Sequence, residues 1–307
     1  MTIVITGCTT RKRQPVTADL HAGRLAPAPL CALAHSWRTR IHASKVRYPA
    51  RHLYGGRNFQ ESVAVADQHA APLFIVSAGL GLVQSETLIP AYSCTVIPGT
   101  DDDVLARVTD SSSALDWWNV IGASSGLSCR LADVLSADDG LVLTALSRVY
   151  LELLAPQIER LPHSARSRFR LLTRAPLSGI SPSLRPMVMP YDDRLDGPQS
   201  SVRGTRSDFA SRALRHFAEH ILRKDDQRDA NEHAAAVTSV IAYWEYPEKQ
   251  ERARHDDPTL RRLIAQHWDA LGGSSTKLLP FFRRELNISC EQGRFAGLVQ
   301  QVRSARS

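Results

Sequence analysis

Two short apolar runs, each ending in a turn of small residues, constrain the fold of this chain most strongly. The first occupies residues 3–5 and stops at Gly7, and the second occupies residues 73–76. Between them, residues 28–43 and 59–70 repeat apolar side chains at the spacing of amphipathic helices. Strands that are joined through helices pair in parallel, because parallel strands need a long crossover. The sequence therefore predicts an α/β fold with a parallel sheet.

Residues that suit a phosphate follow both predicted strands. In an open parallel sheet, ligands bind at the carboxyl ends of the strands, where backbone N–H groups, hydroxyls and cations hold an anion. Glycines in such turns let the backbone approach a ligand closely. The sequence has no P-loop, and its G-x-G-x-x-G pattern is incomplete because Gln84 stands at the last position. We predict a phosphate- or nucleotide-binding site formed by Thr9, Thr10, Arg11, Lys12, Ser77, Gly79, Gly81 and Tyr92.

Three residues are candidates for catalysis. Cys8 is a candidate nucleophile because neighbouring cations would lower the pKa of its thiol, although a cysteine at a strand end more often packs as a small apolar residue. Asp192 and Asp193 follow a strand predicted at residues 186–189. They would supply a carboxylate acid or base, or else form a solvated turn that pairs internally with Arg194.

The sequence predicts neither a cofactor nor a metal. The acidic run at residues 101–103 suits the positive end of a helix better than Mg²⁺. His216, Glu219 and His220 match the H-x-x-E-H zinc pattern, but no third ligand follows them. The five cysteines include no C-x-x-C pair, which indicates a reducing compartment. No apolar stretch approaches the roughly 18 residues that span a bilayer, so we expect a cytoplasmic protein without membrane contact.

Charge is distributed unevenly along the 307 residues, whose formal net charge is +7. Residues 1–57 hold ten basic side chains and one acid, a balance of +9. Residues 58–160 hold four basic and thirteen acidic side chains, a balance of −9, and the remainder returns to +7. This segregation predicts a polyanionic partner, either a nucleic acid, with DNA favoured, or a nucleotide.

The carboxyl-terminal third is predicted to be helical. We expect an α/β domain over residues 1–200, which includes a helix at 138–160, and an all-helical region over 201–307. Its last helices, at 275–286 and 290–302, have the proportions of a helix-turn-helix, and Ser289 with Gln292 is predicted to form a capping box. The candidate DNA-binding residues of this motif are Lys277, Arg283, Arg284, Gln292 and Arg294.

Four motifs of the first hundred residues resemble those of a known family. They are Gly7-Cys8-Thr9-Thr10-Arg11-Lys12, His52-Leu53-Tyr54, Ser77-Ala78-Gly79-Leu80-Gly81-Leu82 and Pro90-Ala91-Tyr92. Together they resemble uncharacterised bacterial domains related to the YaaA peroxide-stress proteins, and domains that accompany tRNA-guanine-transglycosylase-like proteins. Ser93 stands where the family usually has an aspartate. The resemblance implies a Rossmann-like or uracil-DNA-glycosylase-like domain that handles a nucleobase or nucleotide in DNA modification or phage defence.

Three functions are compatible with these features. The leading hypothesis is a nucleic-acid-associated enzyme that acts at a base–sugar bond, in which Tyr54 or Tyr92 stacks on an extruded base. The second is a non-catalytic DNA-recognition subunit, completed by protein partners in a larger defence or modification complex. The third is a nucleotide sensor whose helical region signals.

Overall fold

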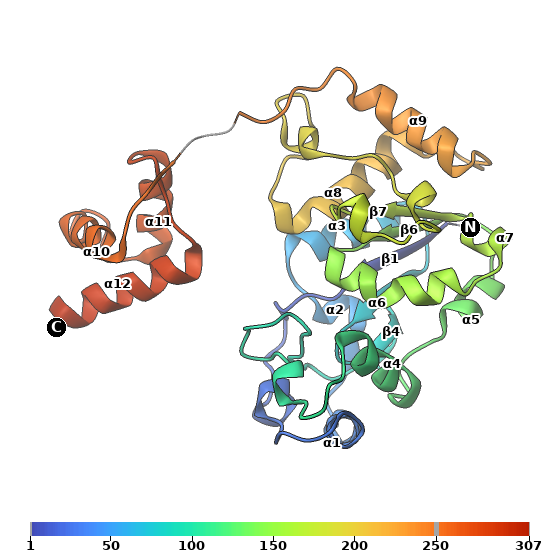
Figure 1. Ribbon diagram of the computed structural model, residues 1–307, viewed down its shortest axis with the longest axis horizontal. Coiled ribbons are helices and arrows are strands. Elements are labelled where there is room, and N and C mark those ends of the chain that lie inside the picture. The colour runs from blue at the N-terminus through green and yellow to red at the C-terminus, as the bar shows by residue number, and fades with distance from the viewer. Residues whose placement is uncertain (1, 249–251, 307) are drawn as a thin grey trace. The chain divides into compact units, whose positions relative to one another are not determined.

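The computed structural model describes residues 2–248 and 252–306, which divide into two compact units (Figure 1). The first, called the sheet unit below, comprises Met1–Pro247. The second, called the C-terminal unit, comprises Glu248–Ser307. Each unit has a hydrophobic core of its own.

Five strands form the central sheet: Ile3–Gly7 (β1), Leu73–Ser77 (β3), Gly81–Gln84 (β4), Val142–Ala145 (β6) and Phe169–Leu172 (β7). Their order is β4-β3-β1-β6-β7, and all are parallel except β4, which runs antiparallel to β3 at one edge. A separate antiparallel pair joins Tyr48–Pro49 (β2) to Leu88–Ile89 (β5). The predicted α/β class is therefore confirmed, and the sheet is parallel as predicted except at β4.

Alternate residues of β1 face opposite sides of the sheet, so each side has a separate core. Ile3 and Ile5 belong to one core and Val4 to the other. Helices cover both sides (Figure 1). The core that holds Ile3 and Ile5 is covered by Leu30–Ala43 (α1), Ala114–Ser124 (α4) and Arg148–Glu159 (α6). The opposite core is covered by Arg57–Gln68 (α3), Phe209–His216 (α8) and Ala230–Ile241 (α9). Shorter helices span Ala50–Leu53 (α2), Leu131–Ser136 (α5) and His163–Arg166 (α7), and Phe217–Ile221 continues α8 as a π-helical turn.

The segment at 138–160 is not the single helix that its pattern predicted. It forms β6, which pairs with β1 on one side and β7 on the other, and α6 begins only at Arg148. A short apolar run fits a buried strand as well as a helix. Parallel partners on both sides satisfy the backbone groups of this strand, and that tertiary pairing decides its conformation.

The strand predicted at Pro186–Met189 is also wrong. Arg185–Met187 is a 3-10 turn, and Val188 makes a single bridge to Leu171 of β7. Pro186 has no N–H to donate to a strand ladder, which limits pairing at this edge.

The described part of the C-terminal unit contains three helices and one short strand pair. The helices span Asp257–Gln266 (α10), Ser275–Arg284 (α11) and Gln292–Arg306 (α12), and Ala253–Arg254 (β8) pairs in parallel with Ile288–Ser289 (β9). The predicted capping box is wrong because Ser289 lies in β9. The carboxylate of Glu291 instead accepts hydrogen bonds from the N–H groups of Gly293 and Arg294.

The sheet unit extends past the boundary predicted at residue 200. The amphipathic helices α8 and α9 belong to it because their apolar faces complete the core on one side of the sheet. Within the described ranges, no helix combines the length and apolarity needed to cross a lipid bilayer.

Candidate functional site

A cavity of about 720 Å³ opens at the carboxyl ends of β1, β6 and β7. It lies where the strand order reverses, since β3 follows β1 in the chain but pairs on the opposite side from β6. Ligands of open α/β sheets bind at such switch points. Besides its arginines, the cavity is lined mainly by glycines and hydroxyl side chains, among them Gly7, Thr9, Thr10, Gly55, Gly56, Ser147, Tyr150, Thr205, Ser207 and Ser211.

Five arginines line this cavity, which we call the arginine cavity: Arg11, Arg57, Arg148, Arg174 and Arg206. Three of them are ion-paired: Arg57 with Glu61 at 3.2 Å, Arg148 with Glu152 at 2.7 Å, and Arg174 with Asp193 at 2.5 Å. Arg11 and Arg206 make no ion pair with any described residue. One carboxylate, Asp208, lines the described part of the cavity. The balance of charge therefore favours an anionic ligand.

Two helices begin at the edge of the arginine cavity. α3 starts at Arg57 after Gly56, whose φ of 98° favours glycine, and α6 starts at Arg148 after Ser147. Neither helix has a side-chain cap on its first N–H groups. The positive ends of both helix dipoles add to the field of the arginines.

The loop that carries Arg11 is held by the segment before α3. The hydroxyl of Thr9 donates to the carbonyl of Gly55 at 2.7 Å, and the N–H of Gly55 donates to the carbonyl of Arg11 at 2.9 Å. A Cβ on Gly55 would lie 3.3 Å from Cγ of Arg11. These contacts fix Thr9, Thr10 and Arg11 in the cavity wall, where the predicted phosphate-binding residues of this loop were expected.

Lys12 points away from the arginine cavity into the protein. Its ammonium donates to the carbonyl of Thr9 at 2.5 Å and lies about 5 Å from the ring centroids of Tyr54 (5.0 Å) and Tyr92 (5.1 Å). Burial lowers the pKa of Lys12, an effect that the thiol of Cys8 partly offsets. Lys12 thus holds the loop from behind and does not line the cavity.

Ser77 and Tyr92 lie in a buried hydroxyl chain outside the cavity lining. The hydroxyl of Tyr92 lies 2.5 Å from that of Ser77 and 2.7 Å from that of Tyr54. All three residues are fully buried, and burial raises the pKa of both tyrosines. Neither ring is accessible for stacking on a base. The ligand-binding role predicted for Ser77 and Tyr92 has no support in this geometry.

Gly79 and Gly81 serve the packing of the turn between β3 and β4. A Cβ on Gly79 would lie 2.8 Å from the ring of Tyr92, and Gly81 has a φ of 87° with Gly122 against it. Three indole N–H groups bind successive carbonyls of this turn: Trp118 to Ser77, Trp117 to Ala78 and Trp37 to Gly79, at 2.8–2.9 Å. The close approach that glycine permits here is to Tyr92 at Gly79 and to Gly122 and Ser128 at Gly81, so both glycines meet other parts of the protein.

Cys8 forms part of the cavity wall beside Tyr150. Its sulfur lies 3.2 Å from the Tyr150 hydroxyl, and 6% of the residue is exposed. Of the described residues that line the cavity, Tyr150 alone is aromatic. The arrangement agrees with the interpretation of Cys8 as a small packed residue, and its catalytic role stays a prediction.

Asp192 and Asp193 line a second cavity, of about 560 Å³, that shares Arg174 and Ala175 with the first. The Asp192 carboxylate accepts hydrogen bonds from the side chain of Arg194, and Asp193 accepts from Arg174. Burial tends to raise the carboxyl pKa of Asp192, but the bonds from Arg194 outweigh it and lower the pKa. Because the two cavities share only Arg174 and Ala175, Asp192 and Asp193 lie near the arginine cavity but do not line it.

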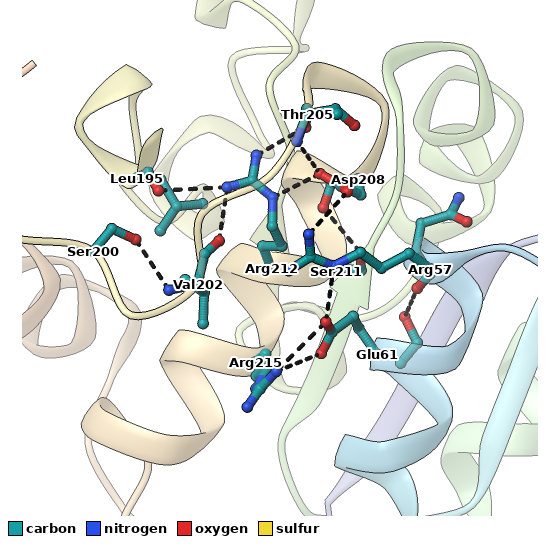
Figure 2. Close-up of polar contacts among 12 residues, drawn as sticks. Arg57, Glu61, Leu195, Ser200, Val202, Thr205, Asp208, Ser211, Arg212 and Arg215 are labelled. Carbon is teal, nitrogen blue, oxygen red and sulfur yellow. Dashed lines mark hydrogen bonds and ion pairs between the residues drawn. The ribbon is translucent and has the colours of Figure 1, made fainter. Parts of the chain in front are cut away.

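Asp208 is the cavity residue that sequence reasoning missed most clearly. One of its oxygens accepts from Nε of the buried Arg212 at 2.6 Å and from the N–H of Thr205 at 2.8 Å. Its other oxygen lies 3.9 Å from Arg57 (Figure 2). The Thr205-Arg206-Ser207-Asp208 segment has the spacing of a capping box, and this signal could have located the start of the helix.

Arg212 fixes the loop that brings Asp208 and Arg206 to the cavity. Its guanidinium donates to the carbonyls of Val202 and Thr205 at 2.9 and 2.8 Å (Figure 2). The side chain is fully buried. The arginines of the cavity come from five separate segments, so no local pattern could have grouped them.

The predicted DNA-binding residues have different surroundings in the C-terminal unit. Arg294 pairs with Asp257 at 2.5 Å, and Arg283 donates to the carbonyl of Cys290 at 2.9 Å. Lys277, Arg284 and Gln292 are exposed. Arg294 is also exposed, with 43% of its side chain accessible beside Asp257, so four of the five predicted residues are accessible to a partner.

The two histidines of the H-x-x-E-H pattern have different surroundings, because His220 is exposed. His216 is buried, and its Nδ1 lies 2.7 Å from the Tyr191 hydroxyl. Burial, together with the nearby His220, lowers the pKa of His216 to about 4. No group of three metal-ligating side chains occurs within residues 2–248 or 252–306.

Comparison with known proteins gives one match. A family of unknown function, DUF6884, matches residues 42–104, which extend from the end of α1 through α3, β3 and the tryptophan-bound turn. The match covers about a fifth of the chain and includes Gly55, Gly56 and Arg57 of the cavity wall. No curated protein and no solved structure matches the chain.

Proposed function

We propose that the sheet unit binds a nucleotide, free or within DNA, by its phosphate in the arginine cavity and acts on the bond between its base and its sugar. The observation that carries this proposal is a cavity at the switch point of the sheet whose described lining holds five arginines and a single carboxylate. Its volume of about 720 Å³ is in the range of pockets that bind small organic ligands. The charge segregation of the sequence is in keeping with such a ligand.

Hydrolysis of a base–sugar bond needs a negative charge near the sugar. The C1′–N bond breaks, its electron pair leaves with the base, and water adds its oxygen to C1′ while its proton passes to the departing base. Positive charge builds on the sugar in the transition state, and a nearby carboxylate stabilises it. Sequence reasoning gave this role to Asp192 or Asp193. Asp208 is a further candidate, since it lines the cavity itself.

The fold supports an assignment more specific than the α/β class, namely a Rossmann-like or a glycosylase-like domain. Four parallel strands in the order β3-β1-β6-β7, with helices on both sides and a cavity at the β1–β6 switch point, are compatible with either. The motif resemblance to the YaaA-related domains points in the same direction.

A product assay tests the proposed reaction. The full chain is incubated with nucleotides and with plain and modified DNA, and the products are separated to detect a released base. We expect release that falls strongly in Asp208→Asn and in Arg11→Ala but persists in Arg13→Ala, whose exposed side chain in the same loop lies outside the cavity lining. Release that is equal in Arg11→Ala and the parent protein would place the reaction elsewhere.

A second candidate function is DNA recognition by the C-terminal unit as part of a larger assembly. The observation that favours it is the pair of exposed cations on α11, Lys277 and Arg284, next to the amino end of α12 with its exposed Gln292. α11 and α12 are joined by a short connection, as in a helix-turn-helix. Both functions are compatible within one chain, because they use different units.

A further inference from the structure

The second cavity adjoins the arginine cavity on the side of β7. The two share Arg174 and Ala175, which directly follow Thr173 at the end of this strand. Arg174 stands at the junction, where its guanidinium binds Asp193 at 2.5 Å and lies 5.9 Å from the ring centroid of Phe209. The two cavities therefore meet at this side chain.

Exposed apolar side chains gather at the two joined cavities. Seven large apolar or aromatic residues of the described chain are exposed, and three of them line these cavities. Ile97 is 39% exposed in the first cavity, and Leu177 and Tyr246 are 54% and 62% exposed in the second. Apolar surface that is left open within a concave polar site is typical of a place where a flat organic group packs.

Tyr246 is held in position although its ring is accessible. The ring lies over the guanidinium of Arg194, 5.5 Å from centroid to carbon, and its hydroxyl donates to Asp192 at 3.2 Å. A ring fixed in this way offers a stacking surface with little conformational entropy left to lose. Stacking on tyrosine is a general mode of base recognition because every base has a flat aromatic face.

The carboxylates beside Tyr246 accept hydrogen bonds and cannot donate them when ionised. Asp193 uses one oxygen for Arg174, and its side chain is 44% exposed. The lining of the second cavity contains two arginines, Arg174 and Arg185, and these two aspartates, so its formal charge is neutral. A neutral cavity with exposed acceptors suits an uncharged group that donates, in contrast to the cationic cavity beside it.

We propose that the second cavity holds the base of the nucleotide whose phosphate lies in the arginine cavity, and that it selects bases with an exocyclic amino group. The base stacks on Tyr246, and its amino group donates to Asp193 or Asp192. This inference rests on the proposed function. It leaves Asp208, rather than Asp192 or Asp193, as the carboxylate that faces the sugar.

Matched nucleotide pairs test the inference by isothermal titration of the full-length protein. Cytidine and uridine monophosphate differ in an amino group against a carbonyl and in the neighbouring ring nitrogen, which carries a hydrogen in uracil only, and adenosine and inosine monophosphate differ in the same way. We expect the amino-bearing member of each pair to bind at least about tenfold more tightly, as befits a hydrogen bond to a charged group. Asp193→Asn or Asp192→Asn, whichever residue accepts from the amino group, should bring each ratio close to one, because the amide offers the carbonyl a donor.

Tyr246 variants separate stacking from charge. We expect Tyr246→Ala to weaken each nucleotide roughly tenfold and to leave the affinity for inorganic phosphate unchanged, with Tyr246→Phe restoring most of the loss. Tyr243→Ala is the control, because Tyr243 is 88% exposed and does not line the cavity.

The outcomes distinguish this inference from the function on which it rests. Equal binding within each pair, together with a strong loss in Arg11→Ala, would overturn the base-selection inference and keep the proposed phosphate site. Binding that is indifferent to Arg11→Ala would overturn both.

Discussion

Arg212 carries a positive charge into the interior of the sheet unit and uses it to shape the cavity wall. The guanidinium lies between Asp208 and the carbonyls of the loop that precedes α8, and it is also 2.8 Å from Asp196. Its charge is therefore compensated on several sides at once. Removing a buried charge that has several partners lowers stability, because each partner then stays buried without a hydrogen bond or ion pair.

Replacing Arg212 tests this role. We expect Arg212→Met to lower the free energy of unfolding by about 3–5 kcal/mol, since two carboxylates lose their buried partner. Urea unfolding of the full chain measures the change. Arg223→Ala, at an exposed side chain, is the control and should stay within about 0.5 kcal/mol of the parent protein. A similar small change in Arg212→Met would show that the loop does not depend on this residue.

His216 makes stability depend on pH in a defined window. Its pKa is lowered from 6.5 to about 4 by burial, so between these values the unfolded chain binds a proton that the folded chain does not. Stability should therefore fall as the pH is lowered from 6.5 toward 4, with His216 contributing roughly 2 kcal/mol after allowance for solvent screening. Unfolding of the parent protein and of His216→Gln across this range measures the difference. Equal pH dependence in both proteins would contradict the assignment.

At the scale of elements, the sequence predicted the position of β3 and of the turn after it, but not the reason why glycines are needed in that turn. The apolar runs located β1 and β3 because each is a local pattern with a clear end. The glycines after β3 are required by contacts with Tyr92 and Gly122, residues that the turn meets only in the folded chain. β6 was predicted as part of a helix for a related reason, since a short apolar run forms a strand or a helix according to the elements that pack against it.

Gly79→Ala tests the packing of this turn. The new Cβ would lie 2.8 Å from the ring of the buried Tyr92, so we expect a loss of about 1–3 kcal/mol in the free energy of unfolding. Gly122→Ala is a matched control within α4, where a Cβ meets only ordinary contacts. That variant should be neutral or slightly stabilising, because alanine favours a helix more than glycine does. A destabilisation equal to that of Gly79→Ala would contradict the packing argument.

At the scale of the whole molecule, the sequence predicted one loop of the arginine cavity but only part of the cavity lining. The Thr9–Arg11 loop was found because it follows β1 directly. Arg57, Arg148, Arg174 and Arg206 were not singled out, because each follows a different turn and only the sheet brings them to one edge. The boundary between the two units was misplaced because α8 and α9 look like any amphipathic helices until the sheet core is known.

The C-terminal unit provides a second test at this scale, by the salt dependence of DNA binding. If Lys277 and Arg284 contact phosphates, the double variant Lys277→Ala/Arg284→Ala should weaken duplex binding and reduce the slope of log K against log salt by about 1.8. Filter binding or fluorescence anisotropy at several salt concentrations measures this slope. Arg38→Ala, on α1 of the sheet unit, is the control and should leave the slope unchanged. An unaltered slope in the double variant would exclude these two residues from the interface.

The central claim is that the arginine cavity binds the phosphate of a nucleotide, and isothermal titration with a nucleoside and its 5′-monophosphate tests it most directly. We expect the monophosphate to bind at least about tenfold more tightly than the nucleoside, with Arg11→Ala and Arg206→Ala each removing about tenfold or more of its affinity. Arg13→Ala should leave both affinities unchanged. Equal binding of nucleoside and monophosphate, or equal effects of Arg11→Ala and Arg13→Ala, would contradict the account.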